Sequence, residues 1–190
     1  MEDRVVYLFL ADGFEEIEAL TPVDLLRRAG ISVTTVGVTG KMVVGSHGIP
    51  VAADVTGDEA AKMLADGILP MMVILPGGMP GAKNLDESPL VESFIKAALR
   101  EDAYLAAICA APMILGKRGI LEGKSAVCYP GFEKYLTGAK GQEEGCVCAW
   151  DGKVITGQAM GAATEFALTL VEALKGESTA NELRAAILFE

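Results

Sequence analysis

Four apolar runs of strand length occupy the N-terminal part of the chain, and the segments between them repeat their apolar positions with helical spacing. The runs are RVVYLFL (4–10), ISVTTVGV (31–38), MMVILPGG (71–78) and YLAAIC (104–109). Short continuous apolar runs are typical of strands that are buried on both faces. Their alternation with helices predicts an α/β fold in which a mostly parallel, doubly wound central sheet carries helices on both faces.

Local signals indicate where some helices begin. Ser88-Pro89 has the pattern of an N-cap followed by proline at the first helical position, and TGDE (56–59) has the spacing of a capping box. Pro22 leaves two alternatives open. A helix can start just before this proline, or it can start near Glu15 and kink at the proline.

The rest of the chain predicts two hairpins and two helices. Residues 41–53 are expected to form a small hairpin inserted between the crossover units, and residues 145–158 a second hairpin that turns at Asp151-Gly152. The two C-terminal helices are predicted over 163–176 and 178–187.

The composition is that of a compact globular protein. Of the 190 residues, 51% are hydrophobic and 22% are charged, a balance that argues against disordered and fibrous chains. This length is sufficient for one α/β domain with a core of its own. We therefore expect a single domain over residues 1–190.

The charge balance argues against nucleic-acid and membrane partners. Sixteen basic and 26 acidic residues give a formal net charge of −10, which repels phosphate backbones and anionic lipid headgroups. The basic pairs Arg27-Arg28 and Lys117-Arg118 stand near the ends of predicted helices, where cations complement the helix dipole. The N-terminus lacks the pattern of a signal peptide or a membrane span, so a cytoplasmic protein is predicted.

The four cysteines do not have the spacing of a disulfide framework, so reduced thiols are expected. Cys146 and Cys148 alternate along a predicted strand and share a face, and core packing is their favoured interpretation. For Cys128, a role as a resolving thiol near a cleft is the less favoured interpretation.

Cys109 stands where an apolar strand changes into a helix-like segment. If the strand ends at Ile108 and a helix begins within one or two residues, the thiol lies on a sharp turn at the carboxyl edge of the sheet, where α/β proteins bind ligands. Small Ala110 and Ala111 allow close backbone approach. Free N–H groups and the helix dipole are expected to lower the thiol pKa below its usual value of about 8.5. The alternative is that Cys109 only packs as a small hydrophobe.

Two other strand ends are expected to meet Cys109. Gly77 and Gly78 follow the third apolar run and can turn their amides toward an anion. The first run is followed by three acidic residues, Glu15, Glu16 and Glu18. A carboxyl beside a thiol in a partly dry cleft is expected to have a raised pKa and to exchange a proton with sulfur. For any single glutamate, the alternative is an ordinary complement to the helix dipole.

The single histidine, His47, lies in the first predicted hairpin. A cysteine triad with a downstream histidine base, as in glutamine amidotransferases, therefore cannot be assembled, and a structural zinc site lacks ligands. His47 reaches the site only if the hairpin folds over it or a partner subunit supplies it. A solvated loop histidine is the favoured interpretation.

Four segments, in this order and spacing, resemble the ThiJ/PfpI superfamily and within it the branch of the parkinsonism-associated protein deglycase. They are GFEEIEALTPVDLLRRAG, ILPGGMPGAKNL, AAICAAP and EFALTLVEALKG. The resemblance covers nearly the whole chain. It implies a flavodoxin-like sandwich, a homodimer, an oxidisable elbow cysteine and a kinked first helix that contains Pro22.

The same resemblance implies roles for individual residues. Cys109 is the nucleophile, and Glu18 is a protonated carboxyl against its sulfur. The amides of Gly78 and Ala110 form an anion pocket, to which Gly77 is added as a candidate. The expected pocket-lining residues are Glu15, Glu16, Tyr129, His47 and Gln158.

Two residues depart from the pattern of that branch. Tyr129 precedes Pro130 where the branch often has a histidine, and a phenol with a pKa of about 10 is a weak base at neutral pH. Any proton shuttle must therefore fall to Glu18. His47 stands where many relatives have an arginine, which changes the expected substrate contacts.

The function implied is a cysteine-dependent, glyoxalase- or deglycase-like enzyme whose partner is a small reactive carbonyl substrate. It would convert dicarbonyls such as methylglyoxal or glyoxal, or their early protein adducts, to a hydroxy acid without a cofactor or metal. Proteolysis is not expected, because Ala110 rather than histidine follows Cys109. One alternative is a redox-responsive stress protein with chaperone-like activity, in which Cys109 oxidises to sulfinate. Another is an unrelated small-molecule reaction.

Overall fold

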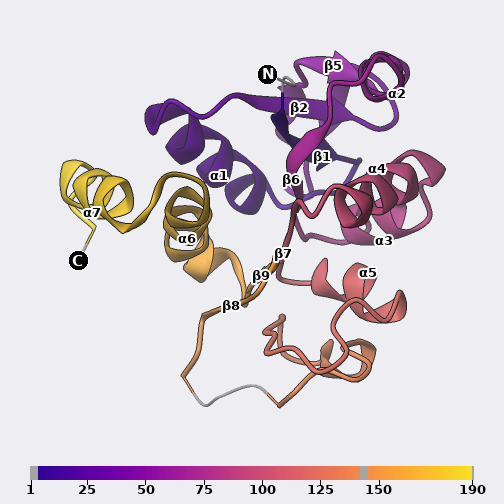
Figure 1. Ribbon diagram of the computed structural model, residues 1–190. Helices are drawn as coiled ribbons and strands as arrows, with labels where there is room; N and C mark the ends of the chain where they lie inside the picture. Colours follow the sequence, from indigo (N-terminus) through magenta and orange to yellow (C-terminus); the bar gives the residue numbers. More distant parts are fainter. Residues whose placement is uncertain (1–3, 142–144, 190) are drawn as a thin grey trace.

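The computed structural model describes residues 4–141 and 145–189. A seven-stranded sheet of order β5-β2-β1-β6-β7-β9-β8 forms the centre of the molecule (Figure 1). Neighbouring strands are parallel except β8, which pairs antiparallel with β9. The strands are β1 (Val5–Leu10), β2 (Val33–Gly37), β3 (Met42–Val44), β4 (Pro50–Ala52), β5 (Val55–Thr56), β6 (Pro70–Leu75), β7 (Tyr104–Ile108), β8 (Cys148–Asp151) and β9 (Val154–Gly157).

Helices cover both faces of the sheet, with α1 and α6 on one side and α2 to α5 on the other (Figure 1). The helices are α1 (Glu16–Arg28), α2 (Gly57–Ala65), α3 (Gly81–Asp86), α4 (Pro89–Arg100), α5 (Pro112–Lys117), α6 (Ala163–Lys175) and α7 (Glu177–Ala186), with short 3-10 turns η1 (Glu133–Tyr135) and η2 (Met160–Ala162). The prediction of a doubly wound, flavodoxin-like fold is confirmed.

Strand β1 shows why the sequence folds into these layers. Tyr7 and Phe9 pack into the core beneath α2 to α5, whereas Val6, Leu8 and Leu10 pack into the core beneath α1 and α6. Successive side chains of a strand point to opposite faces, so a continuous apolar run supplies both cores. All five side chains have no solvent exposure.

The helix signals in the sequence are confirmed at their caps. The Ser88 side chain accepts from the N–H of Val91 at the start of α4, and Thr56 and Glu59 form a complete capping box at the start of α2. Pro22 lies inside α1, so the alternative of a helix beginning near Glu15 is the right one.

The second hairpin turns one residue later than predicted. Asp151 pairs with Val154 in the antiparallel ladder, so Gly152 and Lys153 are the two turn residues. Gly152 has φ +62°, a conformation that glycine adopts without steric cost. The Asp151 carboxylate accepts a hydrogen bond from the N–H of Ser125. Asp151 itself is the last residue of β8 and not part of the turn.

The first hairpin, β3–β4, is fastened to the loop between β1 and α1. The N–H of Gly13 donates to the oxygen of Val44, and the N–H of Ser46 donates to the oxygen of Phe14, both at 2.8 Å. The Asp12 carboxylate accepts from the N–H of Val44. These bonds hold the tip of the hairpin against the start of α1, at the carboxyl edge of the sheet.

In the described parts of the chain, no helix is both long enough and apolar enough to cross a membrane.

Candidate active site

Cys109 follows the last residue of β7 on a sharp turn. Its φ is +64°, in the left-handed region that side chains other than glycine rarely adopt. The N–H of Cys109 donates to the oxygen of Gly157, and its oxygen accepts from the N–H of Tyr129, so bonds on both sides hold the strained residue. Helix α5 begins at Pro112. The thiol lies on the predicted turn after the strand, although the helix begins later than the one or two residues expected. Backbone strain of this kind is typical of functional positions.

Glu18 lies in the first turn of α1 and meets the Cys109 thiol from the other side of the turn. Its carboxyl is almost completely buried and accepts from the N–H of Gly77 at 3.0 Å. Burial raises the pKa of Glu18 to about 7, a change that the hydrogen bond with Cys109 partly offsets and the charge of Glu15 reinforces. Glu18 is therefore the glutamate, of the three considered, that contacts the sulfur.

The expectation of a lowered Cys109 pKa is wrong. Burial raises the pKa of this thiol to about 12, and the charge and hydrogen bond of Glu18 act in the same direction. The N–H groups of Gly78 and Ala110 lower the pKa, but they do not outweigh desolvation. The raised pKa of Glu18 agrees with the expectation for a carboxyl beside a thiol in a partly dry cleft, and burial makes both members of the pair hold their protons more tightly than in water.

The anion pocket consists of two amides rather than three. The N–H groups of Gly78 and Ala110 both interact with the Cys109 sulfur. Gly77 is excluded from the pocket, because its N–H is committed to the Glu18 carboxyl. A Cβ at Gly77 would lie 2.5 Å from Glu18 Oε2 and 2.7 Å from Cys109 Cβ, so a glycine here lets the carboxyl and the thiol approach each other.

A cleft of about 150 Å³ opens over the thiol. Its walls are Gly78, Met79, Cys109, Ala110, Tyr129 and Phe132, a lining that contains no aspartate, glutamate, lysine, arginine or histidine. Tyr129 thus lines the cleft as predicted. A larger hollow of about 640 Å³ lies near the starts of α2 and α4, but it contains neither a thiol nor a histidine. The smaller cleft is the one that contains the Cys109 thiol.

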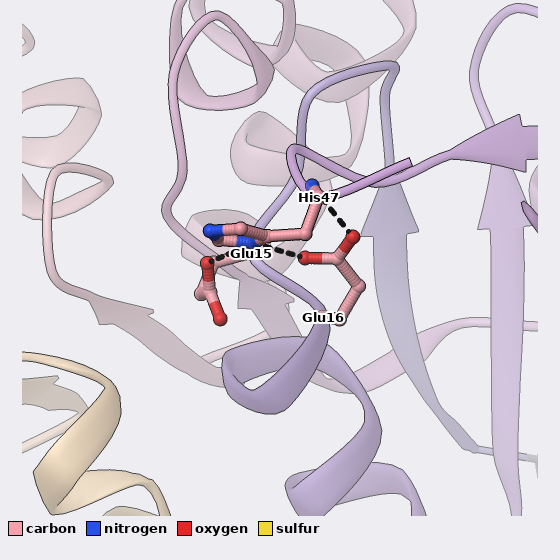
Figure 2. A group of neighbouring side chains, drawn as sticks. All are labelled: Glu15, Glu16 and His47. Carbon is pink, nitrogen blue, oxygen red and sulfur yellow. Dashed lines mark hydrogen bonds and ion pairs between the residues drawn. The ribbon is translucent and has the colours of Figure 1, made fainter. Parts of the chain in front are cut away.

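Glu15 and Glu16 point toward the tip of the first hairpin, where His47 lies between their carboxylates (Figure 2). Burial would raise the pKa of Glu16, but hydrogen bonds from His47 and from backbone N–H groups lower it to about 2. The hydrogen bond with Glu16 raises the pKa of His47. The favoured interpretation of His47 as an exposed loop residue agrees with its side chain being 69% exposed. Glu15, Glu16 and His47 do not line the cleft over the thiol, so their expected place in the pocket lining is not borne out.

Several other predicted or missed residues are now placed. Gln158 follows β9 and does not line the cleft, although it was expected to do so. Met79 and Phe132 do line the cleft, and the sequence did not predict them. Their only signal is position: Met79 follows Gly78, and Phe132 lies three residues after Tyr129.

The remaining thiols do not face the cleft. Cys128 is completely buried, which leaves its sulfur no access to the cleft as a resolving thiol. Cys146 and Cys148 are half-buried, and the Cys148 thiol contacts Thr169 Oγ1 at 3.5 Å. The expectation of core packing holds for them only in part.

Glu18 makes stability depend on pH. Because its pKa is 4.5 when solvated and about 7 in the folded state, folding takes up a proton between these values, and stability falls as pH rises through this window. Above pH about 7 the buried Glu18 carboxylate lowers the free energy of unfolding by about 3 kcal/mol. We expect Glu18→Gln to gain stability relative to wild type as pH rises from 4.5 to 8, measured by urea unfolding in metal-free buffer. A constant difference between the two proteins would contradict the buried, titrating carboxyl.

Comparisons with known proteins agree with this fold. The model of the DJ-1/PfpI family matches residues 4–173. The Parkinson disease protein 7 homolog of Danio rerio is 36% identical over the whole length of both chains. The glutathione-independent glyoxalase DJR-1.2 of Caenorhabditis elegans is 31% identical over 96% of this chain and 94% of its own. The solved structure "Toxoplasma gondii DJ-1, oxidized" superposes with a TM-score of 0.88 at 31% identity, covering 98% of each chain.

Proposed function

The chain belongs to the DJ-1/PfpI family, and from this premise we propose that it converts reactive dicarbonyls such as methylglyoxal, or their early protein adducts, to hydroxy acids. The observation that carries the proposal is the contact between Cys109 and Glu18 under a small cleft. A relative over nearly the full chain is named as a glutathione-independent glyoxalase. The proposed enzyme acts in the cytoplasm.

The cleft suits a small neutral aldehyde. Its lining carries no charged side chain, and Glu15 and Glu18 lie close behind it, so an anionic substrate would be repelled. Tyr129 and Phe132 form the outer wall with apolar surface. A molecule of three carbons reaches the thiol without having to bury a charge.

In the first step, Cys109 sulfur adds to the aldehyde carbon of methylglyoxal. The new bond is S–C, the carbonyl π pair moves to oxygen, and the thiol proton passes to the Glu18 carboxylate. The N–H groups of Gly78 and Ala110 stabilise the oxyanion, which then takes the proton from Glu18 to give a hemithioacetal and to restore the Glu18 carboxylate. Because Glu18 accepts the thiol proton as the bond forms, a high resting pKa of the thiol does not prevent attack.

In the second step, Glu18 moves a proton between adjacent carbons. The carboxylate removes the C–H proton of the former aldehyde carbon and returns it to the neighbouring carbon, while the hydroxyl proton moves from the former aldehyde oxygen to the former ketone oxygen. The product is a thioester of lactate on Cys109, and water cleaves the S–C bond to release lactate and the thiol. The net change is the addition of one water, so no oxidant, reductant or cofactor is consumed.

The test is methylglyoxal consumption with detection of lactate, for the wild-type protein in a buffer that contains no amine. Catalytic lactate formation is expected. An equivalent measurement with a methylglyoxal-modified peptide shows whether early adducts are also substrates. Slow loss of methylglyoxal without lactate would contradict the proposal, because it would indicate only stoichiometric trapping by nucleophiles.

A second candidate function is redox sensing by Cys109. It is favoured by the two amides and the carboxyl around the sulfur, which can hold the oxygens of a sulfinate, and by the absence of a catalytic histidine from the cleft lining. The resting thiol pKa of about 12 counts against rapid oxidation.

Mild peroxide treatment separates these two functions. If Cys109 is a redox sensor, mass spectrometry will find two added oxygens on Cys109 before any change at the half-buried Cys146 and Cys148. Equal oxidation of all three thiols would contradict this second function and leave the first one intact. The buried Cys128 is the internal control, because it should react last.

We also propose that the chain acts as a homodimer. Large apolar side chains are exposed together on α1 and the adjoining hairpin, namely Ile17, Leu20, Met42, Val44 and Ile49. Light scattering should give a dimer for wild type and a monomer for Leu20→Arg. The matched control is Leu99→Arg on α4, at the opposite face of the sheet, which should remain a dimer. A wild-type monomer would contradict the proposal.

A further inference from the structure

Three ligand atoms converge at the tip of the first hairpin, outside the thiol cleft. They are His47 Nδ1, one carboxylate oxygen of Glu15 and one of Glu16, and all lie within 4.8 Å of one another. Figure 2 shows the imidazole lying between the two carboxylates, with α1 supplying one side and the hairpin the other. Residues 31 and 32 positions apart in sequence thus present one nitrogen and two oxygens to a common point.

We infer that Glu15, Glu16 and His47 form a binding site for a divalent transition-metal cation, with Zn²⁺ as the best match. Imidazole and carboxylate both bind Zn²⁺ at about 2.0–2.2 Å, and two such ligands on a tetrahedral ion lie about 3.3 Å apart. The distances from His47 Nδ1 to Glu16 Oε2 and Glu15 Oε2 are 3.0 and 3.3 Å. The side chains of His47, Glu15 and Glu16 therefore need to move little for a metal ion to take the place of the proton between them.

The ligands are held in place by a second layer of hydrogen bonds. The Ser46 hydroxyl lies 3.2 Å from Glu15 Oε2 and 3.3 Å from Glu16 Oε2, and the backbone N–H of His47 donates to Glu16 Oε1 at 2.8 Å. Gly45 allows this approach, because a Cβ at that position would overlap the Glu16 carboxylate. Partners of this kind orient metal ligands and limit the entropy lost on binding.

Charge favours a dication at this point. The side chains of Glu15 and Glu16 are only 12% and 6% exposed, so two negative charges are largely removed from water. Among residues 4–141 and 145–189, His47 is the single basic side chain within 4.0 Å of either carboxylate, and it supplies at most one positive charge. A divalent ion balances both carboxylates while the imidazole binds in its neutral form.

The site is open to its ligand and does not contain the thiol or the Glu18 carboxyl. The exposed His47 ring leaves a path from solvent, and three protein ligands leave a fourth position for water. Cys109 and Glu18 are not part of the cluster. The inference therefore stands whether or not the protein acts on dicarbonyls.

The test is direct binding of Zn²⁺ by calorimetry, with Co²⁺ absorption and imidazole NMR as structural readouts. Because the chain has one histidine, every imidazole signal reports on His47. We expect one saturable Zn²⁺ site per chain, with the NMR pattern of coordination through Nδ1. His47→Ala and Glu16→Gln should each weaken binding at least about 10-fold, and Gly45→Ala should do the same without removing any ligand.

Two controls exclude other binding modes. Cys109→Ala should bind Zn²⁺ as wild type does, and Glu177→Gln on the exposed surface of α7 should have no effect. The inference is overturned if wild type shows no saturable binding up to about 1 mM Zn²⁺, if His47→Ala binds equally well, or if binding disappears in Cys109→Ala.

Discussion

Replacing Glu18 by glutamine should lower kcat/KM for methylglyoxal by about 10² to 10⁴-fold while the protein stays folded. The thiol has a pKa raised to about 12 and needs a base at the moment of attack, and within the cleft region Glu18 is the carboxyl in contact with it. The same carboxylate carries the proton between the two substrate carbons. The amide oxygen of glutamine can still accept from the N–H of Gly77, so the fold should be retained.

Steady-state kinetics and far-UV circular dichroism check this expectation together. The matched control is Glu177→Gln, which makes the same chemical change on the exposed surface of α7 and should keep full activity. If Glu18→Gln retained activity within about threefold of wild type, Glu18 would have no role in proton transfer, since loss of a general base costs at least about 10²-fold.

Replacing Gly78 by alanine should have the second large effect, on both stability and activity. Gly78 has φ +84°, and a Cβ there would overlap the backbone nitrogen of Glu15 and lie 2.6 Å from the oxygen of Gly13. Backbone atoms cannot move aside cheaply, so we expect a loss of at least about 2 kcal/mol. The displaced N–H would also leave the anion pocket, which costs about 10² to 10³-fold in kcat.

Urea unfolding and the kcat of the folded fraction separate the two parts of this effect. Gly119→Ala is the matched control, because Gly119 has φ +70° with open space around it and therefore reports backbone strain without a clash. We expect Gly78→Ala to be the less stable variant by more than 1 kcal/mol. Equal stability of the two variants, with unchanged kcat for Gly78→Ala, would contradict the tight anion pocket.

Much of the fold was predictable from the spacing of apolar residues and from the helix-capping residues in the sequence. The apolar runs became β1, β2, β6 and β7, and the caps at Ser88 and Thr56 formed as predicted. These features are local, so neighbouring residues determine them. Pro22 was ambiguous for the opposite reason: packing of α1 against β1 and α6 decides whether the helix continues through a proline, and no local pattern contains that information.

Part of the membership of the site was predictable from the sequence, but its electrostatics were not. A strand-to-helix change marked Cys109, and the order of strand ends brought Glu18 and Gly78 to it. The direction of the thiol pKa could not be derived, because burial and a nearby carboxylate outweigh two amides only in the folded geometry. The same holds for Gly77, whose N–H turns to Glu18 rather than to the pocket.

His47 shows the limit of sequence reasoning most clearly. Its position in a hairpin indicated a solvated loop, and only the bonds between that hairpin and the β1–α1 loop bring it to Glu15 and Glu16. A contact between residues 31 and 32 positions apart depends on how the hairpin packs against the β1–α1 loop. The candidate metal site was therefore invisible before the structure was known.

The most direct test of the central claim is lactate formation from methylglyoxal by wild type, Cys109→Ser and Glu18→Gln, measured side by side in an amine-free buffer. The thiol–carboxyl pair predicts steady turnover in wild type and its collapse in both variants. Turnover that persisted in Cys109→Ser would show that the sulfur is not the nucleophile and would contradict the mechanism.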